Sequence, residues 1–182
     1  MKHISNDNSG FAKNALWIAV LVSSVTLSSF VFACATPFAA LAALGALTLR
    51  RREAFGLVMA AWAANQFIGY AFLGYPWTTD SFAWGLMIGL AGLAAVETAM
   101  VTRALWPDVW VAEPMLAFVG AFVAYEGVLY ATAIVASDTS GFSVGIVGYV
   151  FEVNAAAFVG LLVLQAIARA LGMIGRPARV TS

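Results

Sequence analysis

Charged side chains are scarce in this sequence. Only 10% of the 182 residues are charged, with nine Lys or Arg against nine Asp or Glu, and 63% are hydrophobic. An ordinary soluble domain carries roughly 25% charged residues. Intrinsic disorder is excluded because it requires low hydrophobicity and high charge. A nucleic-acid partner is not expected, because no basic surplus exists to neutralise phosphates. The composition predicts an integral membrane protein surrounded by the lipid bilayer.

Histidine and cysteine are almost absent. His3 and Cys34 are the single residues of their kinds, so an intrachain disulfide and a Cys/His zinc site are both excluded. The sequence contains no phosphate-binding loop, no nucleotide-binding fingerprint and no nucleophile–base set, and we therefore expect no enzymatic activity. Cys34 lies in apolar sequence, where a thiol is most often inert packing. The alternative is a soft ligand to a metal or a metal-centred cofactor.

Long apolar segments are plentiful. A bilayer core of roughly 30 Å needs about 20 apolar residues per helix. Four segments meet this requirement, at 54–74, 83–104, 115–136 and 142–168. A further apolar stretch at 15–49 is too long for one crossing, and Thr36-Pro37 near its middle disfavours a continuous helix. We predict two helices there, at about 14–34 and 38–50, joined by a tight outer turn.

These segments predict an all-α, polytopic bundle of six transmembrane helices with both termini in the cytoplasm. A polar tail (1–13) precedes the transmembrane domain (14–172), and a basic tail (173–182) follows it. This topology places all nine basic residues on the cytoplasmic side, as the positive-inside rule requires. The alternative is five spans plus a re-entrant or interfacial segment. We expect a multi-pass protein of a cell membrane, in particular the bacterial inner membrane.

Small residues spaced four apart predict close packing between helices. Gly85 and Gly89 form one such pair, and Gly141 and Gly145 form another. A sharper alternative is that an alanine-rich face docks another membrane subunit. The alanines that would form this face are Ala39, Ala40, Ala42, Ala43 and Ala46.

Several polar side chains lie within the predicted spans, where a carboxylate costs about 2.5–3.5 kcal/mol on insertion scales. Glu126 and Glu152 have no basic side chain at their depth, whereas Glu97 lies near a helix end and is expected to reach toward Arg103. The central carboxylates are either neutral cross-links between helices or ligands of a proton, a metal ion or an organic cation. The outer segment 74–80 is either an interfacial belt or a lid over an outward-facing pocket. The predicted substrate-binding residues are Asn65, Tyr75, Trp77, Asp80, Glu126, Tyr149, Glu152 and Asn154.

A six-span chain of this length, with alanine-rich helices at 39–44 and 60–64, resembles the substrate-binding membrane subunits of energy-coupling-factor vitamin and metal transporters. The resemblance covers the whole chain in architecture. It implies uptake of a small solute or cation through an outward-facing cavity, with partner subunits that supply ATP hydrolysis, and it suggests a cobalamin-like ligand for Cys34. The alternative is a non-catalytic accessory or assembly subunit of a larger membrane complex. A homo-oligomer is compatible with either function.

Overall fold

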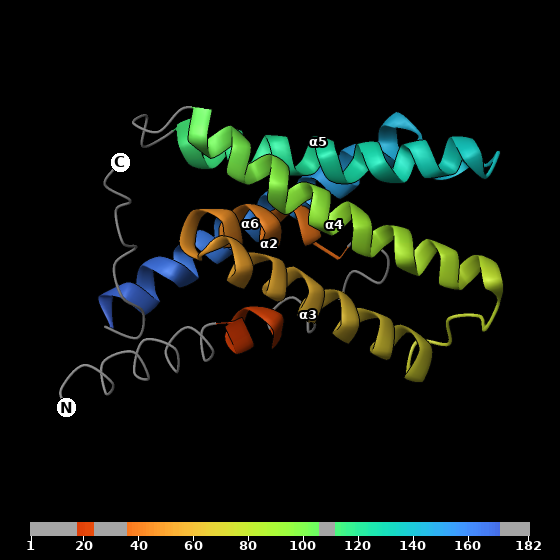
Figure 1. Ribbon diagram of the computed structural model, residues 1–182, viewed down its shortest axis with the longest axis horizontal. Coiled ribbons are helices and arrows are strands. Elements are labelled where there is room, and N and C mark those ends of the chain that lie inside the picture. Colours follow the sequence, from red (N-terminus) through yellow and green to blue (C-terminus); the bar gives the residue numbers. More distant parts are fainter. Residues whose placement is uncertain (1–17, 24–35, 106–111, 172–182) are drawn as a thin grey trace.

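The computed structural model describes residues 18–23, 36–105 and 112–171, and every regular element in these ranges is a helix (Figure 1). The predicted all-α class is therefore confirmed. The predicted tails and Cys34 lie outside the described residues. After a helical stretch at 18–23, the elements are α2 (Phe38–Thr48), α3 (Arg51–Ala71), α4 (Thr79–Leu105), α5 (Ala112–Val135), the short 3₁₀ helix η1 (Ser140–Phe142) and α6 (Val144–Ala170).

Three of these helices, α4, α5 and α6, are long and apolar enough to cross a membrane. Helix α3 has 21 residues, but two arginines at its start and the amides Asn65 and Gln66 lower its hydropathy. The described helices therefore form a bundle compatible with a membrane protein. The number of six spans and the placement of the termini remain predictions.

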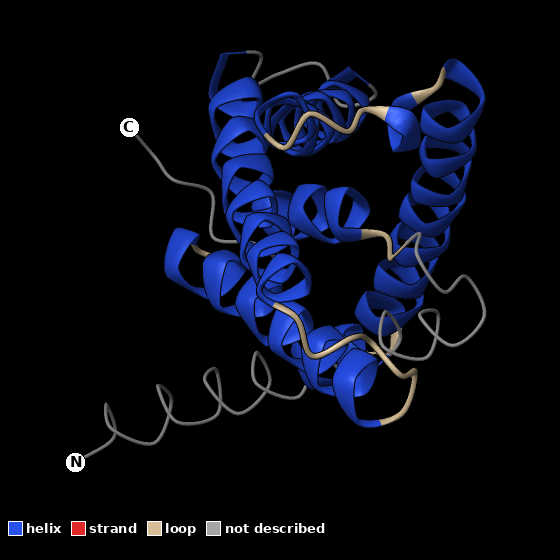
Figure 2. Cartoon of the chain, turned by 90° about the vertical axis from the view of Figure 1, so that its right-hand side faces the viewer, coloured by secondary structure: helices blue, strands red, loops and turns tan. Residues whose placement is uncertain are grey.

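Helix α2 lies at the centre of the described helices (Figure 2). It has 11 residues and is therefore about 16 Å long, roughly half the thickness of a bilayer core. It contacts α3, α4, α5 and α6, and all its residues from Phe38 to Ala46 are buried. Its sequence, FAALAALGALT, is apolar on every face. A helix of this kind is suited to complete burial, and its alanines let neighbouring backbones approach closely.

Apart from the helical stretch at 18–23, the helix predicted at 14–34 lies outside the described residues, as does the beginning of the turn predicted before α2. Thr36 is 8% exposed and Phe38 is 2% exposed, so the start of α2 lies inside the bundle. Six spans, and the alternative of five spans plus a re-entrant or interfacial segment, both remain predictions. The helix predicted at 38–50 is itself confirmed, within two residues at its end.

The small-residue predictions have mixed outcomes. The alanines proposed to dock a partner are at most 1% exposed, so that interpretation is wrong because the chain's own helices cover them. Gly85 and Gly89 do mediate close packing, since a Cβ at Gly89 would lie 3.0 Å from the Trp62 ring and one at Gly85 would lie 2.6 Å from Gln66 Oε1. Gly141 and Gly145 are exposed and have open space around them in the described chain, so no helix packs there.

The bundle has two chemically different ends. The α2–α3 connection, the C-terminal ends of α4 and α6 and the start of α5 lie at one end (left in Figure 1), opposite the α3–α4 and α5–α6 connections. Every arginine in the described ranges belongs to the first end, here called the arginine end: Arg50, Arg51, Arg52, Arg103 and Arg169. The expected Glu97–Arg103 contact is wrong, because Arg51 lies 2.9 Å from Glu97 instead.

Candidate functional site

The start of α2 is held by an asparagine from α6. The first N–H groups of a helix have no partner within the helix. Asn154 is fully buried, and its Oδ1 accepts a hydrogen bond of 3.3 Å from the backbone N–H of Ala40. Its Nδ2 donates to the Val150 carbonyl at 2.9 Å. The Nδ2 bond holds the side chain against its own helix, and the Oδ1 bond joins α2 to α6.

A second asparagine reaches the same point from α3. Asn65 is buried, and its Oδ1 accepts a hydrogen bond of 3.1 Å from the Thr36 hydroxyl. Thr36 immediately precedes Pro37, the residue that caps α2. The structure thus brings two of the predicted polar residues, Asn65 and Asn154, to the start of α2, where both act as cross-links between helices.

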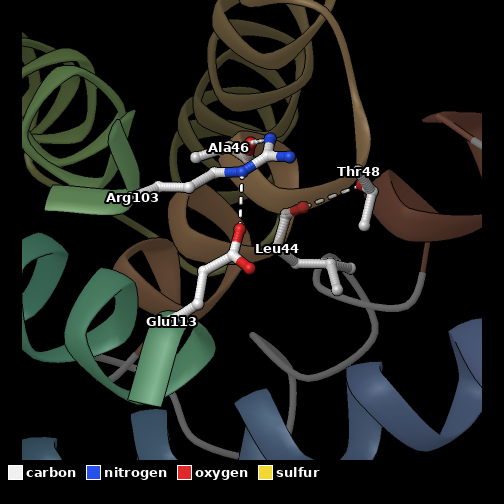
Figure 3. Close-up of polar contacts among 5 residues, drawn as sticks. All are labelled: Leu44, Ala46, Thr48, Arg103 and Glu113. Carbon is white, nitrogen blue, oxygen red and sulfur yellow. Dashed lines mark hydrogen bonds and ion pairs between the residues drawn. The ribbon is translucent and has the colours of Figure 1, made fainter. Parts of the chain in front are cut away.

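The other end of α2 is fixed by Arg103 of α4 (Figure 3). Its Nη1 donates to the Ala46 carbonyl at 2.8 Å, and its Nε lies 2.7 Å from a carboxylate oxygen of Glu113 on α5. The Thr48 hydroxyl donates to the Leu44 carbonyl at 2.7 Å. Carbonyl groups at a helix C-terminus carry partial negative charge and favour a cation. Helix α2 is therefore anchored at both ends.

The predicted carboxylate site is not assembled among the described residues. Glu126 is half-buried on α5, whereas Tyr149 and Glu152 are exposed on α6. The two helices are adjacent, since the Phe122 and Phe151 rings lie 5.0 Å apart. No hydrogen bond or ion pair joins either carboxylate to another described residue. In the same ranges, no group of three or more His, Cys, Asp or Glu side chains is arranged to hold a metal ion.

A cavity of about 530 Å³, open at the surface of the bundle, lies between α3 and α4 in the half away from the arginine end. Of the predicted outer segment, Trp77 lines this cavity and is 74% exposed. Tyr75 instead packs its ring over Gly69, and Asp80 is exposed in the first turn of α4. The main lining side chains are Trp62, Gln66, Phe67, Tyr70, Trp77 and Phe82.

The aromatic wall of this cavity is ordered by its own contacts. The rings of Tyr70 and Phe82 are stacked, with centroids 4.9 Å apart and planes inclined by 22°. Trp77 lies 5.3 Å from Tyr70. The Tyr70 hydroxyl shares a hydrogen bond of 3.0 Å with Ser81, and the indole N–H of Trp62 donates to the Gly85 carbonyl at 2.7 Å. The polar atoms of these rings are therefore already engaged within the protein.

Gln66 is the polar exception in the lining. Its amide nitrogen is buried and has no hydrogen-bond partner among the described residues. A buried donor without a partner costs about 1–3 kcal/mol, so most such groups in folded proteins are paired. Its neighbour Gly85 has no side chain, which leaves room for the Gln66 amide between the helices. Gln66 is the group at this site whose hydrogen-bonding capacity the protein leaves unused.

Sequence reasoning did not place Trp62, Gln66 or Tyr70 in a site. A signal for them exists, because residues four apart lie on one face of a helix. Their spacing therefore puts an indole, an amide and a phenol in one stripe along α3. The stripe becomes a cavity wall only because Gly85 of α4 faces it, and that pairing is not visible in the α3 sequence.

Comparison of the chain with protein-family models, with curated proteins and with solved structures found no match. The chemistry of the site is therefore argued from its own residues. The part of the chain that the structure describes offers an aromatic cavity lined by one amide, Gln66, whose nitrogen is buried and unpaired. It also contains a short helix whose two ends are anchored inside the bundle.

Proposed function

We propose that the protein is a multi-pass transport protein of a cell membrane, and that it captures a small molecule in the cavity between α3 and α4. The cavity itself carries this proposal. Its volume of about 530 Å³ falls in the range of roughly 300–1,000 Å³ that is common for ligand pockets. Its lining of aromatic rings with one polar amide is also the usual composition of such pockets.

The position of the cavity supports capture from outside. Basic residues near the ends of spans favour the cytoplasmic side, and all arginines of the described ranges lie at one end. The cavity lies in the opposite half, along the C-terminal part of α3 and the first turns of α4. The proposed direction of movement is therefore inward, from the aromatic half toward the arginine end.

The short, buried helix α2 supports transport rather than binding alone. Many transporters place substrate sites beside discontinuous helices near the bilayer midplane. Here Asn65 holds Thr36 at the start of α2, and the next residue, Gln66, lines the cavity. A movement of α3 at the cavity would therefore be passed to the start of α2 through Asn65 and Thr36. We propose α2 as the element that rearranges during release.

The source of energy would lie outside this chain. The sequence has no phosphate-binding loop, so an ATP-driven cycle would require a second subunit. This requirement agrees with the resemblance to substrate-binding subunits of energy-coupling-factor transporters. In that arrangement this chain would bind the substrate, and its partner would supply the free energy for transport.

A cavity-filling variant tests the proposal. Ala71 lines the cavity and is exposed, so Ala71→Trp is expected to occupy the cavity without disturbing the core. Ala60 is exposed on nearly the same face of α3, three helical turns earlier, and Ala60→Trp is the matched control. Native mass spectrometry should find a small molecule bound to the wild type and to Ala60→Trp but not to Ala71→Trp. That molecule should then accumulate in cells that express the wild type. An identical set of bound molecules in all three proteins would contradict the proposal.

An accessory-subunit function is the second candidate, and α6 is the observation in its favour. Only 17% of the most apolar window of α6 is buried, and Glu152 is exposed on this helix. A carboxylate at membrane depth is costly when it faces lipid. In this case Glu152→Leu should release a partner subunit from the purified complex and leave the occupant of the cavity unchanged. Loss of the small molecule without loss of a partner would argue against it.

A further inference from the structure

We infer that the cavity between α3 and α4 takes an uncharged ring molecule that carries a hydroxyl group, and that this molecule enters from the lipid bilayer. The ring would lie against the aromatic wall, and its hydroxyl would donate a hydrogen bond to the side-chain oxygen of Gln66. This inference rests on the proposed function and names the class of molecule that the site takes.

The opening of the cavity favours a lipid-soluble molecule. The lining side chains Phe67 and Leu86 are more than half exposed, and Trp77 and Phe82 are exposed beside them. Exposed apolar side chains that gather in this way mark a surface that meets lipid or another apolar partner. In a membrane protein, a molecule dissolved in the bilayer can therefore reach the cavity from the side, between α3 and α4.

The aromatic wall favours a ring. Tyr70 and Phe82 are stacked at 22°, and the Trp77 ring stands edge-on to Phe82 with centroids 5.9 Å apart. Aromatic rings prefer offset-stacked or edge-to-face neighbours. A ring molecule can extend both arrangements across the open side of the cavity, where it would cover the exposed face of Trp77.

The charge of the lining selects against ions. None of the described residues that line the cavity is charged, so a charged ligand would find no counter-ion. A cation would gain attraction from the ring faces. It would also have to leave water without a charged partner, which is strongly unfavourable. An uncharged molecule does not bear this cost.

The polar atoms of the lining decide which group the ring must carry. The Trp62 indole N–H is bonded to Gly85. The Tyr70 hydroxyl is bonded to Ser81. The amide nitrogen of Gln66 is buried, so a ligand in the cavity does not reach it. The oxygen Oε1 is the accessible polar atom of this side chain, and it accepts no hydrogen bond from another described residue. A ligand can therefore bond to Gln66 only by supplying a donor, which an uncharged ring alcohol carries as its O–H group.

The depth of Gln66 makes this hydrogen bond valuable. Helix α3 ends at Ala71, so Gln66 lies about 7.5 Å from that end along the helix axis. Polar groups inside a bilayer have no water to bond with. One hydrogen bond from a hydroxyl is expected to strengthen binding about tenfold over an analogue without a donor, which corresponds to about 1.4 kcal/mol.

Three probes with the same two-ring outline test the hydroxyl group. 2-Naphthol is uncharged and carries a donor, 2-methoxynaphthalene is uncharged and has an acceptor only, and N-methylquinolinium is a cation. Their dissociation constants are measured by fluorescence titration of the whole chain in nanodiscs, and the two uncharged probes are compared at equal mole fraction in the lipid. We expect 2-naphthol to bind about tenfold more tightly than 2-methoxynaphthalene, and N-methylquinolinium to bind most weakly. Equal or tighter binding of 2-methoxynaphthalene, or tightest binding of the cation, would overturn the inference.

Variants of Gln66 assign the preference to its side chain. Gln66→Leu and Gln66→Met remove the oxygen and keep a similar volume, so each should bind 2-naphthol and 2-methoxynaphthalene equally. Both variants are expected to fold, because they also delete the buried, unpaired nitrogen. A preference for 2-naphthol that survives in either variant would overturn the inference.

Ala71→Trp separates this inference from the proposed function. It should abolish the binding of both uncharged probes, and undiminished binding would place them outside the cavity and overturn the inference. If the wild type binds both probes equally and Ala71→Trp binds neither, the hydroxyl requirement is refuted and the cavity remains a binding site. If no probe binds to the wild type, the proposed function is refuted as well.

A naphthol with a long alkyl chain on the ring opposite the hydroxyl tests entry from the bilayer. The chain holds this tailed probe in the lipid. We expect it to bind as tightly as 2-naphthol at equal mole fraction in the lipid, and we expect Ala71→Trp to abolish its binding. Binding of 2-naphthol without binding of the tailed probe would show that the ring arrives from water, and it would overturn entry from the bilayer.

Discussion

At the scale of single residues, Gly69 determines how the chain leaves α3. The ring of Tyr75 lies over its α-carbon, so a methyl group at this position would overlap the ring carbons Cδ2 and Cε2. The Tyr75 N–H donates to the Gly69 carbonyl at 3.0 Å, and the same ring makes an edge contact with Tyr70 at 5.7 Å. The absence of a side chain at Gly69 therefore lets the segment 74–80 fold back onto the aromatic wall.

We expect Gly69→Ala to lower the free energy of unfolding by about 1–3 kcal/mol, the usual cost of overpacking a well-packed position. Gly56→Ala on the same helix is the matched control. No atom lies within 4 Å of a Cβ built there, so the gain in helix propensity should stabilise by roughly 0.5–1 kcal/mol. Denaturant unfolding in detergent micelles measures both. If the free energy of unfolding changed in the same direction in both variants, the Tyr75 contact would not be the cause of the effect at Gly69.

Asp138 lies in the connection between α5 and α6, outside the spans. The Ser140 hydroxyl donates to its Oδ1 at 2.6 Å and the Ser140 backbone N–H donates at 3.0 Å. These two hydrogen bonds, the hydroxyl first, hold the pKa of the Asp138 carboxyl below its ordinary value. Because the pKa is lower in the folded state, the stabilisation is present above the ordinary carboxyl pKa and is lost as the pH falls through the folded value.

Ser140→Ala removes the hydroxyl hydrogen bond, which is the larger of the two causes that lower the pKa of Asp138. We expect the pKa of Asp138 to rise toward its ordinary value, as followed by carbon NMR of the carboxyl group. The variant should be less stable than the wild type at pH 7, and the difference should disappear as the pH falls through the folded pKa of the wild-type carboxyl, because the carboxyl is then protonated in both proteins. A stability difference that persists at low pH would assign the effect to the turn geometry of Ser140 instead.

At the scale of elements, α2 depends on side chains from its neighbours. Its first N–H groups and last carbonyls lie inside the bundle, where an unpaired backbone group is costly. Asn154 serves the first end and Arg103 the last. An 11-residue helix is too short to be stable by itself in water, so these contacts and the burial of its alanines are what hold it.

Asn154→Leu tests this dependence. It keeps a similar volume but leaves the Ala40 N–H without its partner, which should cost about 1–3 kcal/mol. Hydrogen exchange of the amides at 38–41 should become faster, while the amides of α4 and α5 remain protected. The matched control is Glu152→Leu, half a turn away on the exposed face of α6, which should leave exchange in α2 unchanged. Unchanged exchange in Asn154→Leu would mean that packing alone holds α2.

Most helices could be predicted from the sequence, because an apolar run bounded by polar turns has few other solutions in lipid. The run at 83–104 became Thr79–Leu105, and the run at 142–168 became Val144–Ala170. The burial of α2 could not be predicted in this way. An apolar segment such as 38–48 has the same composition whether lipid or protein surrounds it. Its burial within the protein results from contacts with α4, α5 and α6, which are far away in the sequence.

The candidate site was predicted only in part. Trp77 was expected either in an interfacial belt or in a lid over an outward-facing pocket, and it lies in the lining of the cavity; substrate binding by Trp77 stays a prediction. Polar residues at membrane depth drew attention to Asn65 and Asn154, but their contacts show that each is bonded within the chain. Gln66 faces Gly85, whereas Asn65 faces Thr36 and bonds to its hydroxyl. That difference arises from packing and has no local sequence signal.

At the scale of the whole molecule, the chain is polarised along its length. The arginine end contains the ion pairs of Arg51 with Glu97 and of Arg103 with Glu113. The opposite half contains the aromatic cavity and, among the described residues, no basic side chain. Anionic headgroups and the insertion machinery favour the basic end in the cytoplasm. The inward direction proposed for transport depends on the assignment of the arginine end to the cytoplasmic side.

Single cysteines test the assignment, in a Cys34→Ala background. Thr79→Cys and Thr139→Cys lie at the aromatic end, and Ala104→Cys and Arg169→Cys lie at the arginine end; all four positions are exposed. We expect a membrane-impermeant maleimide to label the first two in intact cells and the last two only after permeabilisation. The reverse pattern would open the cavity to the cytoplasm, so the same binding chemistry would then serve export. Helices α4 and α5 together cross the bundle twice, so the α3–α4 and α5–α6 connections lie at the same end. Labelling of Thr79→Cys and Thr139→Cys from different sides of the membrane would therefore contradict the arrangement of the helices.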